Sequence, residues 1–171
     1  MALVKNKTVI EDLFVMVAEG EPLPADRPAM VGKARYLAER EAITGRNAPL
    51  GLKLAAGEGL DGIEDDISRF TVIALDFPKY TDGRSYSIAR LLRERHGYRG
   101  ELRATGNVLH DQVPLMARCG FDAFDITHPG TLKAVTEGTI VDVQVHYQPA
   151  ASDIRETAPA GTRPWLRVDA G

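Results

Sequence analysis

The sequence predicts an α/β fold in which the strands of a mostly parallel sheet alternate with helices. Three runs, 70–76, 101–105 and 122–126, have the length of strands, the first of them is an apolar run, and stretches with helical spacing separate them. Strands and helices of this length that alternate along a chain build right-handed βαβ units. Two architectures satisfy the pattern: part of a (β/α) barrel and a flavodoxin-like sandwich.

The elements before residue 70 carry weaker signals. Residues 8–17 are extended in character, and a proline-containing stretch follows them. Residues 31–43 have helical spacing, with Gly45 as a stop. In residues 50–54 leucines alternate with other residues, which predicts a short strand. Residues 60–67 predict a short helix.

The clearest strand is the apolar run 70–76, which leads through a charged loop into a helix near 85–96. One face of this helix is expected to carry Ile88, Leu91, Leu92 and Arg95. Gly97 is placed to cap its carboxyl end. Residues 101–105 then return as the next strand.

Pro114 constrains the next helix, because a proline ring in a helix interior clashes with an earlier carbonyl. A start near Asp111, with Asp111 as N-cap, puts Pro114 in the first turn and removes the clash. The order is completed by a strand over 121–126, a helix over 129–137 and a last strand over 140–147, in which apolar and polar residues alternate. The side chains expected in the core are Val72, Ile73, Leu75, Ile88, Leu91, Leu92, Met116, Phe121 and Phe124.

Length and composition fit one α/β domain over residues 1–148, followed by a loosely packed or mobile tail over 149–171. The chain has 171 residues, of which 44% are hydrophobic, enough for a sizeable core. No apolar run approaches the roughly 18 residues of a membrane span. The start of the sequence lacks the apolar core of a signal peptide, and one cysteine fits a reducing compartment. We therefore expect a soluble cytoplasmic protein without a membrane partner.

The net charge of −3 argues against a general nucleic-acid binder. The charge is unevenly spread, because residues 79–103 hold seven basic and three acidic side chains. Such a segment is either a solvated helix face or a docking surface for an anion or an acidic partner.

Two loops carry more polar chemistry than a connection needs. The first follows the strand 70–76, and the second follows the strand 101–105 and contains His110. Consecutive parallel strands deliver their carboxyl ends to one edge of a sheet, which is where open α/β sheets place their ligands. The residues expected to bind a ligand or a partner are Asp76, Lys79, Tyr80, Asp82, Arg84, Arg90, Arg93, Arg103, Asn107, His110 and Asp111.

Each of these residues also has a structural interpretation. Asp76 could serve as a general base or a binding carboxylate, or it could pair with Lys79 or Arg84 and lock the loop. Arg84 at a helix start could hold an oxyanion, or it could pair with Asp82. His110 could transfer protons, or it could simply be solvated.

No cofactor is identifiable from the sequence. The four histidines do not pair with one another or with Cys119 at the spacing of metal ligands, so we expect no metal site. Cys119 is expected to be a buried packing residue. There is no dinucleotide fingerprint and no phosphate-binding loop of the Walker type. A flavin held by unmarked backbone is left open.

Several segments resemble one bacterial family. They are 75–79, 81–84, 86–95, 100–104 and 118–124. These segments are similar to the family catalogued as domain of unknown function 934, and the similarity is dense from about 70 to 126. The sequence departs from the family pattern at Asn107, at His110 and at Val113-Pro114.

The resemblance implies an accessory role in assimilatory sulfate and sulfite reduction, because family members are typically encoded beside sulfite reductase. It transfers no catalytic motif. Two functions are compatible with it. We favour a binding or adaptor protein for sulfite reductase or another enzyme of sulfate assimilation, docking through 79–103. The alternative is a small oxidoreductase-type enzyme with its site at the 76–84 and 105–112 loops. A small anionic ligand fits either function.

Overall fold

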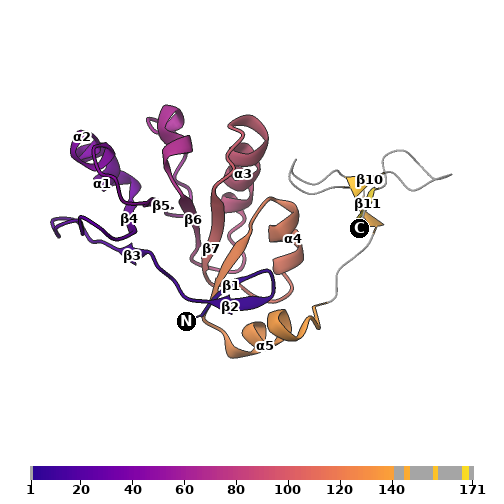
Figure 1. The fold of residues 1–171 in the computed structure, drawn as a ribbon. Coiled ribbons are helices and arrows are strands. Elements are labelled where there is room, and N and C mark those ends of the chain that lie inside the picture. Colours follow the sequence, from indigo (N-terminus) through magenta and orange to yellow (C-terminus); the bar gives the residue numbers. More distant parts are fainter. Residues whose placement is uncertain (1, 141–144, 147–155, 158–166, 170–171) are drawn as a thin grey trace.

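A sheet of eight strands organises the chain (Figure 1). In this computed structural model the described residues are 2–140, 145–146, 156–157 and 167–169. The strands are β1 (Ala2–Lys5), β2 (Thr8–Ile10), β3 (Val15–Met16), β4 (Ala29–Gly32), β5 (Leu50–Leu54), β6 (Val72–Phe77), β7 (Glu101–Gly106) and β8 (Ala123–Ile126).

The strands follow the order β2-β1-β8-β7-β6-β5-β4-β3. Strands β3 to β8 run parallel, each beside the next one along the chain, whereas β1 is antiparallel to both β8 and β2. The mostly parallel sheet that the sequence predicts is thus only partly confirmed, since an antiparallel hairpin extends one edge. A flavodoxin-like sheet reverses its strand order part-way. The sequential order here instead gives a curled sheet like half of a (β/α) barrel.

The helices follow one another around the outside of the curled sheet (Figure 1). They are α1 (Lys33–Ala38), α2 (Arg40–Thr44), the 3₁₀ helix η1 (Glu64–Arg69), α3 (Arg84–Arg90), the π-helical segment η2 (Leu91–Arg95), α4 (Val113–Arg118) and α5 (Pro129–Glu137). Every one of them contributes a buried side chain to a single core cluster. We call this side of the sheet the helix-covered face and the opposite side the helix-free face.

The pleat of β6 shows how the two faces differ. Ile73, Leu75 and Phe77 point into the helix-covered core, whereas Val72 and Ala74 belong to a small second cluster on the helix-free face. Successive side chains of a strand point to opposite faces. The apolar residues 72–75 of β6 are therefore buried on both sides, as expected for a parallel sheet, and only Asp76 near its end is partly exposed.

The connection between β2 and β3 crosses the helix-free face, since these strands lie at opposite edges of the sheet (Figure 1). Asp12 accepts a hydrogen bond of 2.7 Å from Arg103, and the Phe14 ring lies 6.0 Å from the same guanidinium. Phe14 also packs against the cluster that contains Met30. The segment 11–14 therefore covers the amino-terminal half of this face.

From residue 70 to 137 the predicted strands and helices are found with small shifts at their ends. Before that, β1 and β4 were not predicted, residues 31–32 of the expected helix belong to β4, and the helix expected over 60–67 is the 3₁₀ helix over 64–69. Helix 85–96 is present as α3 and η2, and the helix with Pro114 in its first turn is α4. The N-cap of α4 is Gln112 and not Asp111, because the backbone of 107–112 turns once more before the helix begins. No helix among the described residues is long and apolar enough to cross a membrane.

Of the predicted core residues, Ile88 and Leu91 are only half-buried. The others are at most 8% exposed. The inward side of α3 and η2 instead contains Ser85, Ala89, Leu92 and Arg93. The strand expected over 140–147 lies mostly outside the described residues, apart from β9 (Val145–His146). The tail expected over 149–171 does so too, apart from β10 (Glu156–Thr157) and β11 (Arg167–Asp169).

Candidate functional site

Two polar loops meet where the parallel strands end, at what we call the carboxyl edge. The backbone amide of Asn107 donates a 2.7 Å hydrogen bond to the carbonyl of Phe77. Further along, the Gln112 side chain donates a 2.8 Å hydrogen bond to the carbonyl of Tyr80. The loops after β6 and β7 therefore lie side by side on one edge of the sheet.

Gly106 allows this close approach. Its φ of +92° is a backbone conformation that residues with a side chain rarely adopt. A Cβ at this position would lie 2.5 Å from the carbonyl oxygen of Phe77. A larger residue would push the end of β7 away from β6. The sequence therefore places glycine where the two loops come together.

Asp82 and Arg84 form the tightest charged contact of the first loop. The guanidinium donates hydrogen bonds of 2.9 Å and 2.6 Å to the two carboxylate oxygens, and the backbone amide of Arg84 donates a third at 3.2 Å. These hydrogen bonds, from the side chain first, lower the pKa of Asp82 to about 2. The Arg84 guanidinium also lies over Gly57 in the loop after β5. Arg84 thus connects two loops while its side chain stays 61% exposed.

Asp76 lies at the end of β6 and faces the helix-free side. Its carboxylate is 3.4 Å from the Lys53 ammonium of β5 and accepts a 3.2 Å hydrogen bond from the Thr105 hydroxyl of β7. Its backbone carbonyl accepts a hydrogen bond from Ser85 at the start of α3. Three neighbouring strands therefore position this carboxylate.

Asp125 lies on β8, the next strand after β7, and adds a second carboxylate near Asp76 on the helix-free face. Its carboxylate is half-buried, and no residue of the segment 2–140 donates a hydrogen bond or pairs with it at ion-pair distance. Burial raises the pKa of Asp125, and Arg103 opposes this shift. We call Lys53, Asp76, Thr105 and Asp125 the helix-free-face cluster. It occupies the carboxyl half of the face, beyond the segment 11–14.

Five of the predicted residues are exposed on the two loops: Lys79, Tyr80, Asn107, His110 and Asp111. Tyr80 is 59% exposed. Tyr86 of α3 is half-buried, and this burial raises its pKa to about 12, with smaller contributions from Cys119 and Asp111. The edge therefore presents an exposed tyrosine, Tyr80, to the solvent.

The three remaining predicted residues lie away from the edge. Arg90 pairs with Glu94 on the exposed side of the helix. Arg93 and Arg103 are 2% and 4% exposed, so neither offers its charge to the solvent. Their positions show that part of the basic excess of 79–103 serves the interior.

A comparison with protein families identifies the chain as a family member. The model of the family described as "Bacterial protein of unknown function (DUF934)" matches residues 51–158, which is more than half of the chain. The chain belongs to the DUF934 family. No curated protein and no solved structure matches it.

In this DUF934 chain, sequence reasoning missed the partners of Asp76. Lys53, Thr105 and Asp125 sit on three different strands, and only the fold brings them together. A signal was present at Lys53, which alternates with Leu52 and Leu54 and must therefore face away from the core. The alternation says which face Lys53 occupies but not which residue it meets there.

Proposed function

We propose that this DUF934 protein is an accessory protein of assimilatory sulfate and sulfite reduction. It acts as a binding or adaptor partner of sulfite reductase or of another enzyme of sulfate assimilation. Two points support this function: the gene neighbourhood that the family resemblance implies, and the exposed carboxyl edge. The edge is the single structural observation that carries the proposal.

The composition of the edge suits a protein partner. Tyr80 is 59% exposed, and Leu115 of α4 is 50% exposed one turn after Gln112, which holds the Tyr80 backbone. Exposed aromatic residues and arginines provide most of the binding energy in protein interfaces. Lys79 and Arg84 lie close to Tyr80 in the sequence and supply charge that would steer and orient a partner.

Pairing of the charges also favours an adaptor. The Asp82 carboxylate is already bound by Arg84, and Asp76 is already bound by Lys53 and Thr105. Such paired groups stay in place when a partner arrives, so little side-chain freedom is lost on binding. Docking is accordingly expected through the loop 78–84 and the turn 107–112, and not through the buried Arg93 and Arg103.

Pull-down and titration with purified sulfite reductase test the proposal. The full chain should bind the reductase, and Tyr80→Ala should weaken the complex at least tenfold because a central aromatic contact is lost. Lys133→Ala, at an exposed position of α5 away from the edge, is the matched control and should bind like the parent protein. A strain lacking the gene should grow on cysteine but poorly on sulfate.

Two results would contradict the adaptor function. One is normal growth of the deletion strain on sulfate. The other is equal binding by the Tyr80→Ala and Lys133→Ala proteins, which would show that the carboxyl edge is not the contact surface.

A second candidate function follows from the helix-free-face cluster. Asp125 is a half-buried carboxyl with a raised pKa, and Asp76 and Lys53 form an ion pair on the same face. Titratable groups placed in this way are typical of acid–base sites. The alternative function is therefore a small oxidoreductase-type enzyme, with its site on this face and not at the 76–84 and 105–112 loops where the sequence placed it.

The enzyme has its own test. Absorbance spectra of the purified protein, before and after denaturation, would reveal a bound flavin released on unfolding. Lys53→Met and Asp125→Asn should then abolish turnover while Tyr80→Ala leaves it intact. A colourless protein that binds the reductase would instead favour the adaptor.

A further inference from the structure

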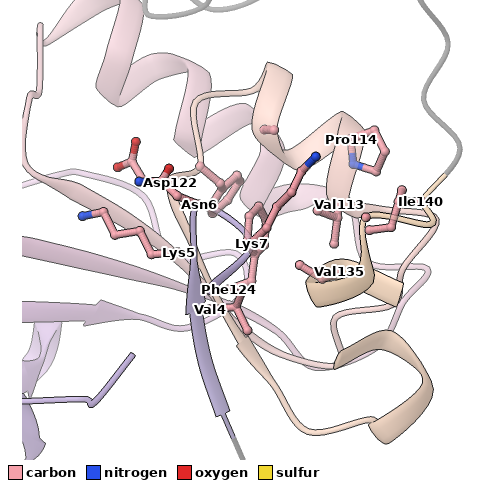
Figure 2. Close-up of a pocket in the computed structure, with 13 residues that line it drawn as sticks. Val4, Lys5, Asn6, Lys7, Val113, Pro114, Asp122, Phe124, Val135 and Ile140 are labelled. Atoms are coloured by element: carbon pink, nitrogen blue, oxygen red, sulfur yellow. The ribbon is translucent and has the colours of Figure 1, made fainter. Parts of the chain in front are cut away.

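A cavity of about 620 Å³ lies on the helix-covered side, and Val113 and Pro114 of its lining directly follow the turn 107–112 (Figure 2). The turn between β1 and β2 forms one wall, and α4 and α5 form the others. Its apolar lining includes Val4, Val113, Phe121, Phe124, Val135 and Ile140. A cavity of this size with an apolar lining and a few polar groups is typical of small-molecule sites.

The polar groups of this cavity come mainly from the turn. Lys5 pairs with Glu101 at 3.0 Å, and Asp122 pairs with Arg93 at 2.6 Å, so both of these charges are balanced. Lys7 is different: it is exposed and forms no hydrogen bond or ion pair with any residue of the segment 2–140. Within residues 2–140, Lys7 is therefore the one charged group of the cavity that has no partner, and it lies at the rim.

The backbone of the turn places Lys7 beside the cavity. Asn6 and Lys7 have φ values of 51° and 62°, which gives the two-residue turn of a tight hairpin. Glycine normally takes the second of these positions. Lys7 there has a left-handed backbone conformation, which is unfavourable for residues that carry a Cβ. The Lys7 ammonium lies 3.9 Å from the position that a Cβ on Gly138 would occupy, at the end of α5. Figure 2 shows the side chain extending from the hairpin toward α4.

We propose that this cavity binds a small amphipathic anion, a molecule with an apolar body and a single carboxylate, sulfonate or phosphate group. The body packs against Phe124 and Val135, where apolar surface is removed from water. The charged group stays at the rim and accepts a hydrogen bond from Lys7. Nothing in the adaptor or enzyme function requires this site, which therefore stands independently of both.

Octanoate and its neutral counterpart 1-octanol are the probes. Titration of the full chain, followed by amide chemical shifts, should move the signals of α4, α5 and the β1–β2 turn. Octanoate should bind more tightly than octanol, because only the anion meets Lys7. Lys7→Gln should weaken octanoate binding roughly tenfold and leave octanol binding unchanged. Lys133→Gln, which removes a lysine of α5 that does not line the cavity, should change neither.

Two further variants make the outcome decisive. Lys7→Gly removes the charge and suits the positive φ, so this protein should fold at least as well as the parent and still lose the preference for octanoate. Ala117→Phe fills the cavity from α4 and should abolish binding of both probes. The proposal is overturned if neither probe binds at millimolar concentration, or if Lys7→Gln and Lys133→Gln weaken octanoate equally.

Discussion

Arg93 and Asp122 are joined by a 2.6 Å ion pair that connects η2 to the residue before β8. The same guanidinium donates hydrogen bonds to the carbonyls of Tyr98, Gly100 and Gly120. Asp122 in turn accepts a 2.9 Å hydrogen bond from the backbone amide of Leu102 in β7. One arginine therefore satisfies backbone groups from the segments around two adjacent strands.

Arg93→Ala should destabilise the fold strongly. The substitution leaves several buried carbonyls without their donor and Asp122 without its partner, and breaking a buried pair in this way costs about 3–5 kcal/mol. Because the Asp122 side chain is 39% exposed, we expect the lower end of this range. Urea unfolding measures the difference. Arg90→Ala, which breaks only the exposed pair with Glu94, is the control and should cost at most about 0.5 kcal/mol.

Leu91 and Leu92 test which side of the helix faces the core. Leu92 is fully enclosed, so Leu92→Ala should cost about 2–5 kcal/mol. Leu91 is half-buried at the edge of the same core, and its truncation should cost about 1 kcal/mol. Denaturant midpoints compare the two variants directly. A larger effect at Leu91 would mean that the helix is rotated from the orientation described here.

The difference between these leucines explains part of what the sequence could not predict. The apolar spacing placed Ile88, Leu91 and Leu92 on one stripe. The observed inward side also contains Arg93, a charged residue that apolar periodicity assigns to the solvent. It is buried because Asp122, 29 residues away, and several carbonyls supply its hydrogen bonds. Partners this distant leave no local signal.

The same reason applies to Arg103. The sequence presented it as part of a basic surface, but Asp12 and Phe14, about 90 residues earlier, cover it. The parallel core of the sheet, by contrast, was predictable. Strands β6, β7 and β8 are runs of strand length separated by helical spacing, and consecutive strands of this kind pair in order. The shared edge of the two loops followed from the order of the strands.

Arg84→Ala should raise the pKa of Asp82 from about 2 toward its ordinary value of 3.8, because the guanidinium hydrogen bonds that hold it down are lost. The folded pKa of Asp82 lies below its unfolded value. The carboxylate therefore stabilises the fold above about pH 4, and the contribution is lost as the pH falls toward 2. NMR titration of the side-chain carboxyl measures the shift. Unfolding of the Arg84→Ala protein at neutral pH would show instead that the pair is needed for the fold.

Cys119 should resist thiol reagents in the native protein. The side chain is 7% exposed, and burial raises the pKa of its thiol, so little reactive thiolate is present at neutral pH. Labelling with iodoacetamide should be slow in buffer and fast in guanidinium chloride. Rapid labelling of the folded protein would contradict the buried position at the end of α4.

Asp125→Asn should make the protein more stable at neutral pH. Burial raises the pKa of Asp125, so its folded value lies above its unfolded value. The stabilising contribution of such a group is present below the unfolded pKa and is lost as the pH rises through the folded one. At pH 7 the ionised carboxylate therefore opposes folding, and an amide of the same shape removes this cost. The urea midpoint should rise at pH 7 and change little at pH 3.

Asp76→Asn is the comparison, because the Asp76 carboxylate already has Lys53 and Thr105 as partners. Replacing a paired carboxylate weakens its contacts, so this variant should be less stable than the parent at pH 7. If Asp125→Asn stabilises the protein and Asp76→Asn destabilises it, Asp125 is kept at a cost to stability, which is characteristic of functional groups. A loss of stability at Asp125 would instead show that its carboxylate is already bound within the folded chain.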